Sequence, residues 1–294
     1  MHRIDDHLSG RVDIAAESIH AFEENLERRT RFCADRGITY RHIIFPDKGS
    51  ALRGAYPGNV EVSYTDAYRP FFNDRVLDLE PILSDETSFL FSDTHLSVQG
   101  MVRSTLAIAT SIYDFDVDRA RRDLNDLIGN EYEAAGDLGR KLDPPVTETR
   151  RQVLGRYLKR FDNRNGANDG HCIVGFNLRR AEGVPSERLL IFGDSFLELG
   201  LPMLSYFFSD VVFCRSRFFH QEMVDMVRPD VVITESAERY FSRVRSDLEA
   251  PRFLLYYGVR GRRYPEDSAF YTALNAALNY PGPQYRSFRD ALTP

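Results

Sequence analysis

The sequence predicts an α/β fold built around a mainly parallel β-sheet. Short apolar runs, typical of strands buried on both faces, alternate with helix-like segments. The alternation is clearest in the second half, where apolar runs at 189–192, 210–214 and 229–235 are each followed by a helical pattern. Parallel strands need crossover connections, so this alternation favours helices on the faces of the sheet. We expect residues 1–294 to form a single domain.

The first half predicts the same alternation less regularly. A helix over 12–36 has apolar residues at helical spacing and ends at Gly37, as a C′ glycine would end it. A β-branched and aromatic strand follows over 38–45. The other elements expected before residue 114 are helices over 64–73 and 98–113 and strands over 75–79 and 88–91.

The pattern changes over residues 114–187, which we expect to form a helical and loop-rich insertion within that domain. This stretch has dense charge, a proline pair and a cluster of Asn, Gly and Asp. A small separate cap is the alternative. Towards the end of the chain we expect helices over 237–244 and 267–278, an edge strand over 252–257, and a surface-bound or frayed tail from residue 280.

The composition excludes several classes of protein. A formal net charge of −6 argues against nonspecific binding of nucleic acid. The three cysteines are scattered without C-x-x-C spacing, so we expect buried thiols rather than disulfides or a zinc site, and no metal or cofactor. No apolar run approaches the roughly 18–20 residues of a membrane span. The first residues lack the apolar region of a signal peptide, which favours a cytoplasmic address.

Ser195 is the candidate nucleophile. It lies in a Gly193-Asp194-Ser195 turn between an apolar strand and a helix, the place where α/β proteins hold their chemistry. The helix start offers backbone N–H groups to an oxyanion, of which that of Ser195 is the best placed, and Gly193 and Phe196 are further candidates for oxyanion binding or positioning. In the alternative interpretation Asp194 is an ordinary helix N-cap.

A serine hydroxyl needs a base, and His95 is the best candidate. Asp93 and His95 are two residues apart, so in extended chain their side chains leave on the same face. This spacing suits a carboxylate that orients one imidazole nitrogen while the other faces a serine. Alternatively, Asp93 caps the following helix and His95 lies on the surface.

Three further residues are candidates for positioning the reactants. Lys48 follows a strand, although a structural ion pair with a carboxylate such as Asp47 is favoured. Arg239 could hold an anionic substrate, or form a salt bridge with Glu235. Tyr240 could donate to an oxyanion, or simply pack.

Five short motifs occur in the same order as in a known family. They are Ile-Ile-Phe-Pro-Asp-Lys at 43–48 with Tyr-Pro at 56–57, Ser-Asp-Thr-His at 92–95 with Gly100, Gly-Asp-Leu at 136–138, Phe-Gly-Asp-Ser-Phe at 192–196, and Pro-Asp-Val-Val-Ile-Thr-Glu at 229–235 with Glu-Arg-Tyr at 238–240. The chain therefore resembles the SGNH-hydrolase-like polysaccharide O-acetyltransferases typified by the alginate acetylation proteins AlgJ and AlgX. In that family the Asp-x-His element precedes the Gly-Asp-Ser element, as it does here.

The resemblance implies a three-layer α/β sandwich and an acyl-enzyme mechanism, with Ser195 as nucleophile, His95 as base and Asp93 as the orienting carboxylate. It implies transfer of acetyl to a glycan from an acetyl donor, with a membrane acetyl-transfer protein as a possible partner. The alternatives to an O-acetyltransferase are an acetylesterase of the same fold and an inactive glycan-binding or assembly protein. Members usually have a signal or anchor, which favours the periplasm or cell envelope if the chain is a fragment. Leu96 stands where many members have an aromatic residue, which would alter the sugar-facing wall.

Overall fold

The computed structural model describes residues 13–55, 62–166, 168–179, 186–264 and 266–292. The chain divides into two compact units. Unit 1 consists of Met1–Glu23, Ile43–Arg156 and Ser236–Val244, and unit 2 consists of Glu24–His42, Tyr157–Glu235 and Arg245–Pro294. A single domain over the whole chain stays a prediction. The motif residues at 56–57 and the first twelve residues lie outside the described part of the chain.

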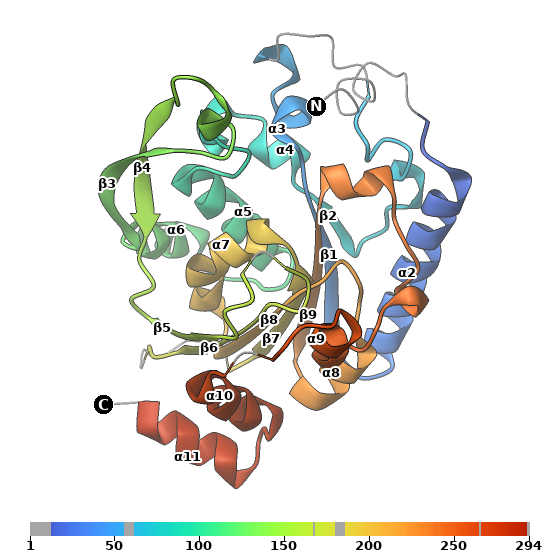
Figure 1. Cartoon of the computed structure of the whole chain (residues 1–294), viewed down its shortest axis with the longest axis vertical. Coiled ribbons are helices and arrows are strands. Elements are labelled where there is room, and N and C mark those ends of the chain that lie inside the picture. Colours follow the sequence, from blue (N-terminus) through green and yellow to red (C-terminus); the bar gives the residue numbers. More distant parts are fainter. Residues whose placement is uncertain (1–12, 56–61, 167, 180–185, 265, 293–294) are drawn as a thin grey trace. The chain divides into compact units, whose positions relative to one another are not determined.

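The main sheet has seven strands in the order β2-β1-β9-β7-β8-β6-β5 (Figure 1). Strand β7 runs parallel to both β8 and β9, whereas β6 is antiparallel to β8 and β5 is antiparallel to β6. Helices flank the sheet, so the predicted α/β architecture with a mainly parallel sheet is confirmed. The strands are β1 Thr39–Phe45, β2 Val76–Asp78, β5 Leu158–Asp162, β6 Cys172–Asn177, β7 Arg188–Gly193, β8 Asp210–Arg215 and β9 Val231–Ala237.

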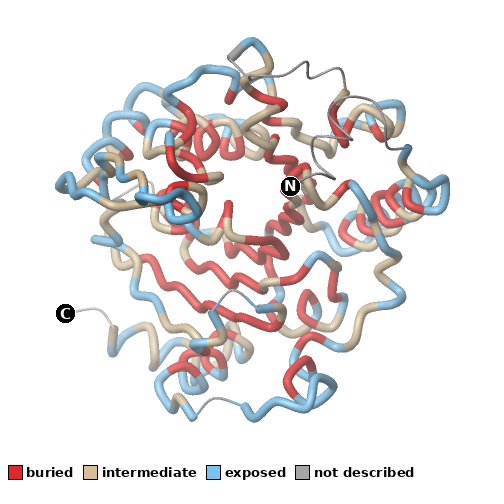
Figure 2. The backbone as a smooth tube through the Cα atoms, turned by 45° about the horizontal axis from the view of Figure 1, so that its top comes forward, coloured by how far each residue is buried: buried red, intermediate tan, exposed pale blue. Residues whose placement is uncertain are grey.

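The central strands form because both of their faces are covered. All six residues of β7 are buried, and so are the first five of β8 and of β9 (Figure 2). A strand buried on both faces is apolar throughout rather than alternating, which is the pattern that predicted these strands. The three cysteines are buried and free, as predicted.

Most of the predicted helices are present. Gly37, with φ of +67°, follows α2 in the left-handed conformation that glycine adopts without a Cβ penalty. Within the described residues, no helix combines the length and apolar character needed to cross a bilayer. The helices are α2 Ala16–Ala34, α3 Lys48–Ala51, α4 Glu80–Leu83, α5 Val98–Thr110, α6 Val117–Asn125, α7 Ser195–Leu204, α8 Gln221–Val227, α9 Tyr256–Val259, α10 Ser268–Leu278 and α11 Pro283–Leu292.

The strand expected over 88–91 is wrong. The chain instead forms a 3-10 turn, η3 Glu86–Ser88, whose N-cap Asp85 accepts from the Thr87 N–H. Beyond it lies an isolated antiparallel bridge between Phe89 and Leu96. The Asp93–His95 segment is therefore a loop leading into α5 and not the end of a sheet strand.

Other differences follow from local packing. The edge strand expected over 252–257 is a 3-10 turn followed by α9, in which Phe253 and Tyr256 place their rings against His220. The tail from residue 280 contains helix α11. The helices expected over 64–73 and 237–244 reduce to the 3-10 turns η2 Arg69–Phe71 and η6 Glu238–Ser242.

The stretch over 114–187 contains more strands than predicted. Besides α6, it forms an antiparallel pair of strands, β3 Ile128–Ala135 and β4 Thr147–Val153, and it contributes β5 and β6 to the main sheet. Exposure alternates from Thr147 to Arg151, with Glu148 and Arg150 on the more covered face. Because the covered residues are charged rather than apolar, the sequence lacks the alternation of apolar and polar residues that would predict this strand.

Candidate active site

Asp93 and His95 form a hydrogen-bonded pair in unit 1. The imidazole Nδ1 of His95 lies 2.7 Å from Oδ1 of Asp93, and the backbone N–H of His95 donates to the same oxygen over 3.0 Å. The Asp93 side chain is 8% exposed and that of His95 is 24% exposed. A carboxylate at Nδ1 makes Nδ1–H the donor and leaves Nε2 as the basic nitrogen. The pairing expected from the spacing of these two residues is therefore observed.

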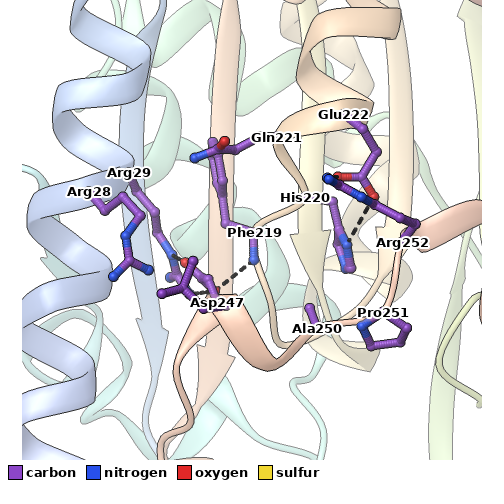
Figure 3. Close-up of a pocket in the computed structure, with 11 residues that line it drawn as sticks. Arg28, Arg29, Phe219, His220, Gln221, Glu222, Asp247, Ala250, Pro251 and Arg252 are labelled. Atoms are coloured by element: carbon purple, nitrogen blue, oxygen red, sulfur yellow. Dashed lines mark hydrogen bonds and ion pairs between the residues drawn. The ribbon is translucent and has the colours of Figure 1, made fainter.

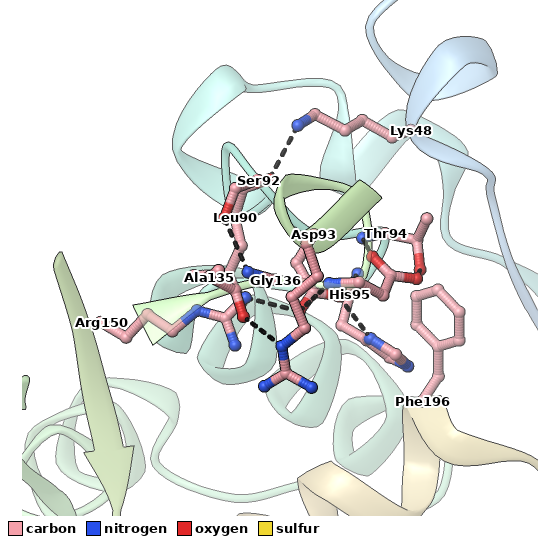
Figure 4. Close-up of polar contacts among 12 residues, drawn as sticks. Lys48, Leu90, Ser92, Asp93, Thr94, His95, Ala135, Gly136, Arg150 and Phe196 are labelled. Carbon is pink, nitrogen blue, oxygen red and sulfur yellow. Dashed lines mark hydrogen bonds and ion pairs between the residues drawn. The ribbon is translucent and has the colours of Figure 1, made fainter. Parts of the chain in front are cut away.

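Two residues of β4, Arg150 and Glu148, hold the loop that carries this pair, and Figure 4 shows Arg150 beside Asp93. Arg150 donates through Nη2 to Oδ2 of Asp93, over 2.5 Å. Glu148, two residues earlier and on the same face of the strand, accepts from the Ser92 backbone N–H and the Ser92 hydroxyl. It also accepts from the Phe91 N–H over 2.5 Å. The pair β3–β4 thus fixes the backbone and the carboxylate of the candidate site.

These contacts determine the ionisation of Asp93. Burial by itself would raise the pKa of Asp93, but hydrogen bonds from His95 and Arg150 hold that pKa well below its ordinary value. The pKa of Glu148 is likewise lowered, because the hydrogen bonds from Ser92 and Phe91 outweigh its burial. Both carboxylates are therefore charged at neutral pH. An ionised Asp93 can orient the imidazole of His95 and stabilise its protonated form.

The chain packs closely behind this loop at Gly136. Its N–H donates to the Ser92 hydroxyl over 3.0 Å, and an added Cβ would come within 2.1 Å of the Ser92 carbonyl oxygen. Asp137 follows, and its carboxylate accepts from the backbone and the hydroxyl of Thr94. The Gly-Asp-Leu motif at 136–138 therefore helps to hold the Asp93–His95 loop in place, through hydrogen bonds to Ser92 and Thr94.

The same residues include a group of potential metal ligands. One ligand atom from each of Asp93, His95 and Asp137 lies within 4.8 Å of the others. However, Asp93 already binds Arg150 and His95, and the Asp137 carboxylate is held by Thr94. A cation would have to displace a guanidinium from Asp93. The donor set thus suits an oriented base better than a metal centre.

Ser195 lies in unit 2, as the first residue of α7, and is half-buried. Asp194 is the N-cap of this helix, and its carboxylate accepts from the Phe196 N–H over 2.9 Å. The capping interpretation of Asp194 is therefore correct, and it is compatible with a nucleophile at the next residue. The Phe196 N–H is therefore engaged in the cap of α7.

Glu235, at the end of the parallel neighbour β9, supports this turn from behind. Its Oε2 accepts from the Asp194 N–H over 2.6 Å. Burial and the nearby Asp194 carboxylate raise the pKa of Glu235 well above its ordinary value. A Cβ on Gly193 would lie 2.5 Å from the same oxygen and 3.1 Å from the Glu235 Cβ, so a larger residue would push Glu235 away from the Asp194 N–H. Glycine at position 193 thus allows the close approach of β7 to Glu235.

The remaining candidates lie in unit 1 with structural partners. Lys48 donates through Nζ to the carbonyl oxygens of Leu90 and Phe91, over 2.7 and 3.0 Å. Arg239 binds Asp47, not Glu235, so that expected alternative is wrong. Tyr240 is half-buried in η6.

The expected role of Leu96 in a sugar-facing wall is also wrong. Its side chain is only 3% exposed, and its backbone forms the bridge to Phe89. A residue buried in this way cannot line a substrate surface.

A hollow of about 270 Å³ lies in unit 2, between α2, the start of α8 and the loop at 247–252 (Figure 3). The charged side chains that line it largely form salt bridges, Arg29 with Asp247 and Arg252 with Glu222. None of the residues predicted from the sequence to act in catalysis lines it.

The comparisons with known proteins bear on the fold. No family model and no curated protein matches the chain. Among solved structures, PatB1 of Bacillus cereus is similar at 13% identity with a TM-score of 0.57, covering 78% of this chain and 92% of that one. A second structure of PatB1 carries a sulfonyl adduct.

Two further structures have the same fold. A DHHW family protein from Eubacterium siraeum has a TM-score of 0.52 at 12% identity, covering 78% of this chain and 87% of that one. The O-acetyltransferase domain of Pseudomonas putida AlgJ has a TM-score of 0.51 at 16% identity, covering 82% of this chain and 91% of that one. The chain therefore has the fold of the AlgJ O-acetyltransferase domain, which the order of its sequence motifs predicted.

Proposed function

We propose that this protein is an O-acetyltransferase that acts on a polysaccharide or other glycan through an acetyl-enzyme. The observation that carries the proposal is the oriented pair of Asp93 and His95, in which hydrogen bonds from His95 and Arg150 lower the pKa of the Asp93 carboxyl. The chain also offers Ser195 at the strand-to-helix turn that follows β7. The fold it shares with a domain named as an O-acetyltransferase supports transfer of acetyl.

In the proposed reaction, Nε2 of His95 takes the proton of the Ser195 hydroxyl while Oγ attacks the carbonyl carbon of an acetyl ester. The backbone N–H at the start of α7 stabilises the oxyanion of the tetrahedral intermediate. Collapse breaks the ester bond, and the leaving alcohol receives the proton from His95. A glycan hydroxyl then gives its proton to His95 and attacks the carbonyl carbon of the acetyl-serine. Collapse of the second tetrahedral intermediate breaks the bond to Ser195 Oγ, which receives the proton back from His95, and the acetylated glycan leaves.

Hydrolysis is the nearest alternative activity, because water can replace the glycan hydroxyl in the second step. An inactive glycan-binding protein is the alternative from another class, and it would have no use for an ionised Asp93 that orients His95. The glycan acceptor, the acetyl donor, a membrane acetyl-transfer partner and the compartment stay predictions.

An activated ester tests the proposal. Wild-type protein should release 4-nitrophenol from 4-nitrophenyl acetate with a rapid first turnover, and Ser195→Ala should remove this burst. A sulfonyl fluoride should inactivate the wild type and label Ser195, in keeping with the sulfonyl adduct seen on PatB1. Equal rates for the wild type and Ser195→Ala would favour the binding protein instead.

A further inference from the structure

Phe91 is the exposed phenylalanine of this chain. All 21 phenylalanines lie in the described residues, and the others are buried or half-buried, whereas the Phe91 side chain is 76% exposed. Single exposed apolar residues are common on protein surfaces, so exposure alone carries little weight. What distinguishes Phe91 is how its backbone is held.

The backbone of Phe91 is fixed on both sides. Its N–H donates to Oε2 of Glu148, and its carbonyl oxygen accepts from the ammonium of Lys48. The neighbouring residues are held by the same two side chains, Leu90 by Lys48 and Ser92 by Glu148. The Lys48 ammonium also lies over the Phe91 ring, 5.8 Å from the ring centroid. The ring is therefore held by a rigid loop and contacted by one cation, and most of the residue remains exposed to solvent.

The same loop carries Asp93, two residues further on, and then His95. A fixed aromatic side chain with only two rotatable bonds can form a contact at low entropic cost. The face of an aromatic ring is electron-rich and attracts partial positive charge. The C–H bonds on one face of a pyranose ring carry such charge, so a sugar can lie flat on an exposed aromatic ring.

The charges beside Phe91 indicate which kind of sugar fits. Lys48 and Arg150 contribute two positive charges, and Asp93, Asp137 and Glu148 contribute three negative ones. These side chains are bound to one another or to the loop backbone. The balance gives a uronate no attractive charge and disfavours it by like-charge repulsion.

We propose that Phe91 is a subsite for the acceptor glycan, on which a neutral hexopyranose stacks. The inference rests on the proposed function and deepens it by naming the class of sugar and a residue that binds it. A sugar on Phe91 is bound by the same loop that carries Asp93 and His95. Lys48 and Glu148 act as positioning residues for the ring.

Direct binding tests the subsite independently of turnover. Cellohexaose and chitohexaose serve as neutral probes, hexagalacturonate serves as the anionic probe, and NMR titration gives the dissociation constants. We expect Phe91→Ala to weaken binding of the neutral probes about five- to tenfold, and Phe91→Tyr or Phe91→Trp to restore it. Tyr132→Ala, which removes a half-exposed aromatic from β3 of the same unit, should leave binding unchanged.

The outcomes separate this inference from the proposed function. If Ser195→Ala binds the neutral probes as the wild type does and Phe91→Ala does not, the subsite stands whatever the enzyme activity. In a transfer assay Phe91→Ala should raise the acceptor KM more than it lowers kcat. The inference is overturned if neither neutral probe binds the wild type, if hexagalacturonate binds more tightly than both, or if Phe91→Ala binds like the wild type.

Discussion

Replacing Arg150 with methionine removes the guanidinium that holds Asp93 ionised, while a side chain of comparable length remains in β4. The Arg150 side chain is 14% exposed and that of Asp93 is 8% exposed, so water cannot fully replace the lost contact. Hydrogen bonds to charged groups contribute about 1.5–3 kcal/mol. If that contribution is realised in orienting His95, kcat/KM should fall roughly 10- to 150-fold.

The change should also alter the pH dependence. In the wild type the pKa of Asp93 is depressed, so its contribution to stability is present above the unfolded value of about 3.9 and is lost as the pH falls through the folded value. Without Arg150 that pKa rises towards its ordinary value. The stability deficit of Arg150→Met relative to the wild type should therefore be full near neutral pH and should shrink as the pH falls below about 3.9.

The neighbouring residue provides a matched control. Arg151 lies on the opposite, exposed face of β4 and pairs with Glu131, with both side chains about half exposed. Exposed pairs contribute at most about 1 kcal/mol, so Arg151→Met should keep the activity and the pH dependence of stability of the wild type. The assay is hydrolysis of 4-nitrophenyl acetate near neutral pH, with thermal unfolding of each variant from acidic to neutral pH. Equal activity and equal pH dependence of stability for the two methionine variants would refute the reasoning about Arg150.

Three further predictions concern the turn that carries Ser195. Gly193→Ala should destabilise the protein by about 1–3 kcal/mol in denaturant unfolding, because its Cβ would lie 2.5 Å from Glu235. Gly200→Ala, in α7 with nothing near the added Cβ, should instead be neutral or stabilise by up to about 1 kcal/mol, and a loss equal to that of Gly193→Ala would contradict this account. The pKa of Glu235 is raised in the folded protein. Its contribution to stability is therefore full below the unfolded-state pKa of about 4.3 and is lost as the pH rises through the folded-state pKa. Glu235→Gln should therefore gain stability relative to the wild type as the pH rises, and a constant difference in Tm across pH would rule out a neutral Glu235.

The parts of the fold that were predictable are those fixed by local sequence. Strands β7, β8 and β9 were recognised because burial on both faces requires continuous apolar runs. The segment at 88–91 is just as apolar, yet among the described residues it belongs to neither sheet, and backbone groups of Leu90 and Phe91 bind Glu148 and Lys48 instead. A short apolar run therefore does not reveal whether a neighbouring strand exists.

In the candidate site too, features fixed by local sequence were predictable and contacts between distant residues were not. The pairing of Asp93 with His95 and the turn at Ser195 follow from spacing within a few residues, and both could be read from the sequence. Arg150 and Glu235 were missed because each acts on a residue about 40 to 60 positions away along the chain. The available signal for β4 is the alternation of Glu148 and Arg150 with outward-facing residues. Because the inward-facing residues are charged, the sequence shows no alternation of apolar and polar residues there.

Trapping the acetyl-enzyme tests the central claim most directly. After brief exposure to 4-nitrophenyl acetate and acid quenching, peptide mass spectrometry should find acetyl on Ser195 in the wild type. It should find none there in Ser195→Ala and far less in His95→Ala. Acetylation confined to other residues, or equal labelling of Ser195 in the presence and absence of His95, would contradict the account.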